Sequence, residues 1–327
     1  MSLAPRTYSE RLGVLSGVQL QQACDRFGLG RVTKAEPASA GLWGQNILLS
    51  TTTGEFVLRG NPQPRWQLAK ERFVAAEITS RSPLPVPWPF LVSNDLDVFG
   101  WPFAIMPRFG GTAGAQLREA ADAAARLRLA AAHGEALAQL HLASFDAPGP
   151  YNEMTDACDP VPDFQAWTLE RIDGLRRRCR AIDALSSEAE LFIDQTIDAC
   201  APALTEPLVP VMVHHDFSLA NTHYEATSDG YRATGVFDLG ESHIGDGEED
   251  LIRFLFRRRR DERTAFISAY TSQHPLRPGA ADRLVLYALA DLLFMWEVSQ
   301  RVTNWFAGST FAETAAPFFA VLRDSTS

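Results

Sequence analysis

Residues 211–251 constrain this chain more than any other stretch, because two acids and an amide follow short apolar runs there. The first run, at 211–213, leads into HHDFSLAN (214–221), which follows the pattern H-x-D-x-x-x-x-N. The second run, at 235–237, ends in DLG (238–240). Short apolar runs bounded by polar residues are typical of strands. The sequence therefore predicts polar side chains on loops at the ends of two strands.

Three of these side chains match the needs of phosphoryl transfer. The carboxylate of Asp216 can accept the proton of an attacking hydroxyl group. The amide oxygen of Asn221 and the carboxylate of Asp238 are the kind of oxygen ligands that Mg²⁺ prefers, and they could hold the ion against nucleotide phosphates. The alternative is a polar turn whose Asp and Asn serve only backbone hydrogen bonds. The two motifs in this order favour phosphoryl transfer.

The spacing resembles the aminoglycoside phosphotransferase and choline-kinase-like family of small-molecule kinases, a branch of the protein-kinase fold. The loop of that family usually reads H-G-D-x-x-x-x-N, and DLG stands where kinases carry D-F-G. The run GDGEEDL (245–251) is also similar to the G-D-x-x-x-D-L run of the family. By this resemblance His214 supports the loop structurally.

His215 departs from the family pattern, which has Gly at this position. Two interpretations stay open: the side chain constricts the loop, or it adds a substrate contact. A zinc site made of His214, His215 and Asp216 is a rival interpretation. It is disfavoured because no further ligand stands at a useful helical spacing.

The resemblance implies an α+β, bilobal protein-kinase-like fold. We expect a smaller lobe at 1–104 that binds the nucleotide phosphates, with an antiparallel sheet and one main helix. A hinge at 105–111 would lead to a larger, mostly helical lobe at 112–327 with the catalytic loop, the metal site and the acceptor site. Hydrophobic periodicity predicts these elements: helices at 8–30, 66–80, 115–145, 164–184, 187–201, 251–260, 262–272 and 280–306, and smaller-lobe strands at 45–50, 55–59, 90–92 and 97–99.

Two charged residues of the smaller lobe are predicted to pair. Arg59 ends the strand at 55–59, and Glu71 shares a helix face with apolar residues, so it needs a cationic partner. In the resembled family this strand carries the cation that contacts nucleotide phosphates. Kinases use Lys there, and the planar fork of Arg implies different phosphate contacts.

The remaining nucleotide contacts are predicted on loops. Gly41 and Gly44 belong to a small-residue loop whose backbone N–H groups could approach phosphates. Met106 and Phe109 lie in the predicted hinge, where the resemblance places the adenine. The family grips its acceptor mainly with carboxylates and aromatic side chains from helices of the larger lobe, and side chains of these types are Asp163, Trp167, Asp291, Trp296 and Glu297.

Composition and net charge limit the classes of molecule that the protein is expected to bind. The formal net charge of −10 argues against a general nucleic-acid binder. An acidic cleft would concentrate a cationic substrate, although solubility explains the same charge equally well. No apolar run is long enough for a membrane helix, and the start lacks a signal-peptide layout. Four scattered cysteines suggest neither a metal pair nor a disulfide framework. We therefore expect a cytoplasmic protein; its oligomeric state stays open.

The predicted activity is Mg²⁺-dependent transfer of the γ-phosphoryl group of ATP or GTP to a hydroxyl group of a small molecule. An aminoglycoside-type acceptor, and hence a role in antibiotic resistance, is the first candidate. A metabolic alcohol kinase acting on choline, homoserine or a sugar derivative is the alternative. A nucleotide-binding pseudokinase with a scaffolding role is the alternative from another class.

Overall fold

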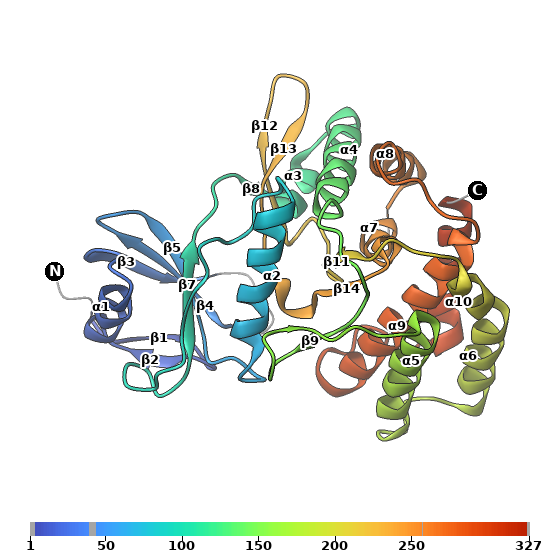
Figure 1. The fold of residues 1–327 in the computed structure, drawn as a ribbon, viewed down its shortest axis with the longest axis horizontal. Helices are drawn as coiled ribbons and strands as arrows, with labels where there is room; N and C mark the ends of the chain where they lie inside the picture. Colours follow the sequence, from blue (N-terminus) through green and yellow to red (C-terminus); the bar gives the residue numbers. More distant parts are fainter. Residues whose placement is uncertain (1–3, 39–43, 257, 326–327) are drawn as a thin grey trace.

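A five-stranded antiparallel sheet forms most of the smaller lobe (Figure 1). The computed structural model describes residues 4–38, 44–256 and 258–325. The strands run in the order β3-β4-β5-β7-β6, with every neighbouring pair antiparallel. Their bounds are β3 (Val32–Pro37), β4 (Asn46–Thr51), β5 (Glu55–Gly60), β7 (Phe103–Pro107) and β6 (Leu91–Ser93).

The two faces of this sheet pack against different helices, because side chains alternate along a strand. Leu58 faces the same hydrophobic cluster as α1 (Gly17–Arg26). Val57 faces the opposite way, toward the cluster that contains α2 (Gln67–Arg81). Arg59 has the same parity as Val57, so it also points toward α2. Figure 1 shows α2 standing between the sheet and the larger lobe.

The first thirty residues differ from the predicted helix at 8–30. A hairpin of β1 (Arg6–Ser9) and β2 (Gly13–Leu15) comes first. The helix α1 begins only after Ser16, whose side chain accepts from the backbone N–H of Gln19 while the Gln19 side chain accepts from Ser16. This reciprocal capping box fixes the start of α1. The predicted strand at 97–99 is also wrong, because these residues form a turn.

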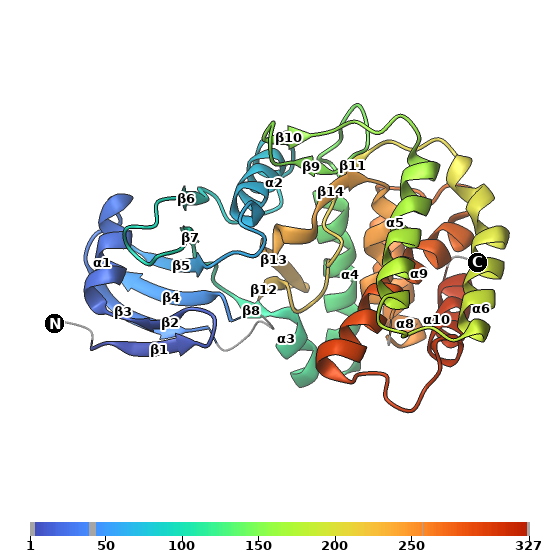
Figure 2. The same ribbon diagram turned by 90° about the horizontal axis from the view of Figure 1, so that it is seen from below.

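Helices dominate the larger lobe (Figure 2). The predicted helix at 115–145 is divided, because Asp122 accepts from the backbone N–H of Ala125 and starts a new helix there. The structure also contains a terminal helix that the sequence pattern did not predict. The bounds are α3 (Gly114–Ala120), α4 (Ala123–Leu140), α5 (Phe164–Arg180), α6 (Ser187–Cys200), α7 (Leu251–Leu255), α8 (Arg260–Thr271), α9 (Ala280–Val298) and α10 (Phe311–Ser325).

Short strands and turns of the larger lobe carry the two motifs. The loop at 214–221 joins β11 to β12, and Asp238 follows β13 directly. The segment that carries the GDGEEDL run returns beside this loop, because β14 pairs antiparallel with β11. All short elements of the larger lobe, including those without a motif, have these bounds: β8 (Thr112–Ala113), β9 (Tyr151–Asn152), β10 (Ala157–Cys158), β11 (Val211–Val213), β12 (Thr222–Ala226), β13 (Tyr231–Val236), β14 (His243–Gly245), η1 (Ala201–Thr205), η2 (Leu239–Glu241), η3 (Gly247–Asp250) and η4 (Ser299–Thr303).

The predicted fold class is confirmed: the chain has a bilobal, α+β, kinase-like fold with a small antiparallel-sheet lobe and a larger helical lobe. The proposed lobe boundaries stay predictions, and β7 runs without a break through the predicted boundary at 104. None of the helices in the described part of the chain combines the length and the apolarity that a membrane crossing requires.

Candidate active site

Asp250, at the end of η3, anchors the loop at 214–221. Its carboxylate is fully buried and accepts hydrogen bonds from two consecutive backbone N–H groups, His214 at 2.7 Å and His215 at 2.6 Å. His141 Nε2, from the end of α4, lies 3.1 Å from the same carboxylate, and Tyr270 holds the other ring nitrogen at 3.0 Å. Buried polar groups must be satisfied in this way, so the last acid of the GDGEEDL run fixes the backbone before Asp216.

His214 ties the loop to the second motif through both of its ring nitrogens. Its Nε2 lies 3.1 Å from the carbonyl oxygen of Phe237, the residue before Asp238. Its Nδ1 accepts from the backbone N–H of Asp216 at 3.3 Å. Since Nδ1 accepts, Nε2 must carry the proton and donate to Phe237. One buried ring therefore sets the distance between the two acid-bearing segments.

Asp216 and Asn221 are held together. The side-chain amide nitrogen of Asn221 donates to the backbone oxygen of Asp216 at 3.0 Å and to its carboxylate at 2.8 Å. The other carboxylate oxygen of Asp216 lies 3.4 Å from Arg253 Nε, and Arg253 also pairs with Asp291 at 2.6 Å. The Asp216 side chain remains 37% exposed, so an incoming group can reach it.

The predicted ion pair between Arg59 and Glu71 forms, at 3.0 Å, and both side chains are largely buried. The same guanidinium nitrogen lies 3.1 Å from Asp238 Oδ1, across the lobes. Burial alone would lower the pKa of Arg59, but the charges of Glu71 and Asp238 raise it above its ordinary value. Arg59 is therefore a fixed cation that joins the β5–α2 pair to the second motif.

The donor atoms fit a magnesium ion. Asn221 bonds Asp216 through its amide nitrogen, which leaves its amide oxygen as a ligand, and Asp238 uses only Oδ1 for Arg59. Amide and carboxylate oxygens suit Mg²⁺, which binds through few protein ligands and keeps several waters. When bound, the ion would neutralise charge on nucleotide phosphates.

The other predicted nucleotide residues lie on the smaller lobe and its connection. Gly44 has a φ of 55°, and its carbonyl accepts from Ser9 Oγ at 2.5 Å; Gly41 lies outside the described residues. Met106 is buried in β7 opposite Val57. The ring of Phe109 covers Gly235 of β13 so closely that a Cβ on Gly235 would stand 2.2 Å from it.

Comparison with known proteins agrees with this geometry. A family model described as the phosphotransferase enzyme family matches residues 34–282, which is most of the chain. The chain belongs to this family. It is therefore a phosphotransferase, and the matched span includes Arg59, Glu71, both motifs and Asp250. A sequence search among curated proteins found no match.

Solved structures of aminoglycoside phosphotransferases share the fold of this phosphotransferase. A thermostable mutant of APH(4)-Ia in a ternary complex with ADP and hygromycin B is 19% identical, with a TM-score of 0.66 over 94% of this chain and 98% of that one. The GDP complex of aminoglycoside 2'-phosphotransferase-IIIa is 16% identical, with a TM-score of 0.65 over 97% and 99%. A candidate fructosamine-3-kinase from Haemophilus somnus 129PT is 16% identical, with a TM-score of 0.61 over 94% and 97%.

One of the predicted acceptor residues of the phosphotransferase stands beside Asp216, and a second packs against His243 of β14. Asp291 of α9 shares Arg253 with Asp216. Trp167 of α5 packs its ring against His243 at a centroid distance of 5.4 Å, beside the GDGEEDL segment.

The other three predicted acceptor residues have partners elsewhere in the fold. Asp163 caps α5 by accepting from Ala166 at 2.9 Å. Trp296 Nε1 donates to the Ala184 carbonyl at 2.8 Å. Glu297 pairs with surface arginines on α5 and η4. The structure does not bring these three side chains to Asp216.

A buried cluster around Glu249 lies next to the loop at 214–221 and was not predicted from the sequence. Glu249 lies 2.8 Å from His215 Nδ1, 3.2 Å from His243 Nε2, and 2.9 and 3.3 Å from the guanidinium of Arg171. Only its place in the GDGEEDL run marks Glu249 in the sequence, because Arg171 comes from a distant helix.

A metal ion is a poor occupant for this cluster. His215, His243 and Glu249 offer ligand atoms within 4.8 Å of one another. However, Arg171 already contacts both oxygens of Glu249 and lies 3.4 Å from His243 Nε2. A divalent cation would stand beside a guanidinium group, so the described geometry favours an all-protein charge network over a zinc site.

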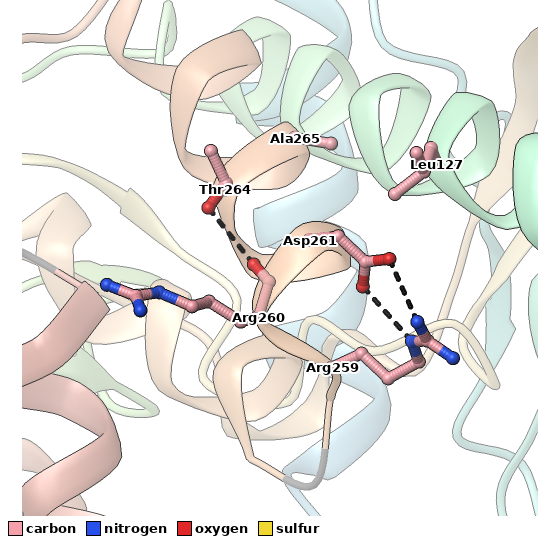
Figure 3. A pocket seen from close by; sticks show the side chains of 6 residues that line it. All are labelled: Leu127, Arg259, Arg260, Asp261, Thr264 and Ala265. Atoms are coloured by element: carbon pink, nitrogen blue, oxygen red, sulfur yellow. Dashed lines mark hydrogen bonds and ion pairs between the residues drawn. The ribbon is translucent and has the colours of Figure 1, made fainter.

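A surface hollow of about 610 Å³ lies elsewhere, between α4 and the start of α8 (Figure 3). Arg259 and Asp261, which both line the hollow, form an ion pair. Its lining residues are Leu127, Arg259, Arg260, Asp261, Thr264 and Ala265. None of them belongs to the group around Asp216, so the hollow is separate from the candidate active site.

Proposed function

We propose that this phosphotransferase transfers the γ-phosphoryl group of Mg-ATP or Mg-GTP to a hydroxyl group of a small molecule. One observation carries the proposal: three distant segments converge, since Arg59 of β5 contacts both Glu71 of α2 and Asp238 after β13. The His214 bridge joins that segment to the loop of Asp216 and Asn221. The ADP and GDP in the two aminoglycoside phosphotransferase structures support a nucleotide co-substrate.

Each residue has a defined role in this proposal. Asp216 accepts the proton of the acceptor hydroxyl, whose oxygen then bonds to the γ-phosphorus. The bond from that phosphorus to the bridging oxygen breaks, and the nucleoside diphosphate leaves. Arg59, held by Glu71, positions the phosphates, while Asn221 and Asp238 hold Mg²⁺. Catalysis would consist mainly of positioning and charge neutralisation.

The nucleotide base would bind at the connection between the lobes. Met106 at the end of β7 and Phe109 over Gly235 offer backbone groups and a ring edge for the adenine or guanine. Gly41 and Gly44 belong to the loop that would approach the phosphates. With every proposed catalytic group in hydrogen-bonding reach of a partner, the scaffold role of a pseudokinase is the weaker reading.

An aminoglycoside-type acceptor is the first candidate, supported by the net charge of −10 and by hygromycin B in the APH(4)-Ia complex. Such an activity would make the protein a cytoplasmic resistance enzyme. A metabolic alcohol is the second candidate. The observation that supports it is that two described acids, Glu249 and Asp291, already pair with Arg171 and Arg253.

The test is mass spectrometry of hydroxyl compounds incubated with the purified protein and Mg-ATP or Mg-GTP. The panel spans aminoglycosides, macrolides, choline, homoserine and sugars. The proposal expects one compound class to gain a phosphoryl group in the wild type and not in Asp216→Asn. Asp198→Asn, an exposed acid on α6, is the matched control.

A metal-dependence experiment separates the kinase from a scaffold. Nucleotide titrations with and without Mg²⁺ should differ in the wild type and converge in Asp238→Ala, which also loses turnover as severely as Asp216→Asn. Near-normal turnover of Asp238→Ala would refute the assigned metal role. Nucleotide binding that ignores Mg²⁺, with no compound modified, would favour the scaffold.

A further inference from the structure

His215 occupies a backbone conformation that a side chain rarely adopts. Its φ is 70°, in the left-handed region that favours glycine. A non-glycine residue there carries a conformational cost that the surroundings must offset, and such residues concentrate at functional sites. Here the cost is offset by Asp250, which fixes the backbone N–H, and by Glu249, which holds the ring.

The ring of His215 is oriented with one nitrogen inward and one outward. Nδ1 lies 2.8 Å from Glu249 Oε1. Nε2 has no hydrogen-bond partner among the described residues, and 17% of the His215 side chain is exposed. The carboxylate of Asp216, the next residue, is also exposed. Arg253 contacts both Asp216 and Asp291, so the residue next to His215 lies in a polar, charged part of the larger lobe.

The surroundings of Glu249 favour the charged form of its side chain. Burial by itself would raise the pKa of Glu249, yet Arg171, His243 and His215 hold it well below its ordinary range. Burial lowers the pKa of His243, although the charge of Glu249 acts in the opposite direction. Burial also opposes the charged form of His215, but the hydrogen bond and charge of Glu249 outweigh it and raise the pKa of His215 above 6.5.

We propose that His215 is an acceptor-contacting residue, which donates a hydrogen bond from Nε2 to an oxygen of the acceptor beside the hydroxyl that is phosphorylated. This inference rests on the proposed kinase function. Glu249 is the positioning residue, because its bond to Nδ1 aims Nε2 and favours the imidazolium form. Arg171, stacked on Trp167 at 4.9 Å, holds Glu249 from the other side.

The proposal defines the acceptor chemically. The compound must carry a second oxygen next to the reacting hydroxyl, as sugars, cyclitols and aminoglycosides do. Choline has a trimethylammonium group in that place, which accepts no hydrogen bond and is repelled by an imidazolium. A contact from His215 would therefore favour polyhydroxyl acceptors over choline.

The contact depends on pH with a defined sign. The folded pKa of His215 is raised, so the donor form is complete at low pH and is lost as the pH rises through that pKa. The charged groups that act on the pKa of His215 are Glu249 of η3, Arg171 of α5 and Asp291 of α9, and the ring of His243 from β14 lies 5.9 Å away. KM for the acceptor should therefore rise toward alkaline pH, with a smaller change in kcat.

The first experiment needs no known acceptor. Nitrogen-15 NMR of the histidine side chains, in the full-length protein, measures the tautomer and titration of His215, with His215→Ala for assignment. We expect a proton on Nδ1 and a pKa above the ordinary value, which falls in Glu249→Gln but not in the exposed control Glu135→Gln. Identical titration in wild type and Glu249→Gln would overturn the proposed pair.

The second experiment uses myo-inositol, D-glucose, hygromycin B and choline as probes with Mg-ATP. For a phosphorylated probe, His215→Ala should raise KM by about tenfold, the loss of one hydrogen bond to a charged donor, and His215→Gln should restore most of it. Unchanged KM in His215→Ala, or choline as the preferred probe, would overturn the inference. Nucleotide titration and circular dichroism establish that each variant is folded.

The same probes also distinguish a failure of the proposed kinase activity from a failure of the proposed His215 contact. If no probe is phosphorylated, each is added with Mg-ADP while the His215 Nε2 resonance is followed. A shift with the polyhydroxyl probes and none with choline supports the contact even without turnover. No shift with any probe overturns it.

Discussion

Replacing Asp250 with Ala should destabilise the protein and disable the loop at 214–221. The carboxylate is fully buried and serves three donors: the N–H groups of His214 and His215, and His141 Nε2. Hydrogen bonds to a charged group contribute about 1.5–3 kcal/mol each, and an orphaned buried donor costs about 1–3 kcal/mol. These contributions overlap and cannot simply be added. We therefore expect a loss of about 3–5 kcal/mol in the free energy of unfolding, which is typical when a buried charged partner is removed.

That loss is a large share of the roughly 5–15 kcal/mol by which a folded domain is stable. Urea denaturation followed by tryptophan fluorescence measures it as a lower midpoint with an unchanged slope. Asp198→Ala removes an exposed acid from α6 and should stay within about 0.5 kcal/mol of wild type. Asp250→Asn keeps the volume but turns an amide N–H toward a backbone N–H, so it should fall between the two.

Activity provides an independent readout of the same change. Arg59 and Glu71, which we propose to position the nucleotide, have other partners than Asp250. A folded Asp250→Ala protein should therefore bind nucleotide with little loss while turnover falls at least a hundredfold (about 2.7 kcal/mol). A free energy of unfolding within about 1 kcal/mol of wild type would refute the reasoning. So would normal turnover, because the loop would then not need its anchor.

Three further changes test other contacts. Glu71→Gln should weaken nucleotide binding measured by calorimetry, because Arg59 loses the carboxylate that orients it and pairs with Asp238 alone; an unchanged Kd would contradict this. Gly235→Ala should displace the Phe109 ring, cost about 1–3 kcal/mol in urea denaturation and lower nucleotide affinity. The depressed pKa of Glu249 adds stability that is complete above its ordinary pKa and lost as the pH falls through its folded pKa; acid titrations of unfolding should show this pH dependence in wild type and not in Glu249→Gln.

The two motifs could be predicted because each is local: acids and an amide at fixed spacing after short apolar runs. The Arg59–Glu71 pair was also predictable, because an acid on an apolar helix face requires a cation. The start of α1 was predicted wrongly although Ser16 and Gln19 carry a legible capping box. Leu12 and Leu15 share a helical spacing with Val18 and Leu20, so apolar spacing alone does not separate the hairpin from the helix.

The roles of Asp250 and Glu249 could not be deduced from the sequence. Their partners come from α4, α5 and β14, and only the tertiary fold brings His141 and Arg171 to the loop. Within GDGEEDL nothing distinguishes an acid that anchors a backbone from one that orients a ring. The left-handed conformation of His215 cannot be seen in the sequence itself. The sequence shows only that a histidine stands where the family usually has glycine.

The helix α2 packs against both lobes. Leu68, Val74 and Ile78 share one hydrophobic cluster with Ala104 and Met106 of β7 and with residues of α4 and α9. Arg59, which Glu71 of α2 holds, contacts Asp238 of the larger lobe with the same guanidinium nitrogen. A rotation of the sheet relative to the larger lobe would therefore have to break the Arg59–Asp238 contact. The relative position of the lobes and the position of the cation proposed to hold the phosphates are thus coupled through one side chain.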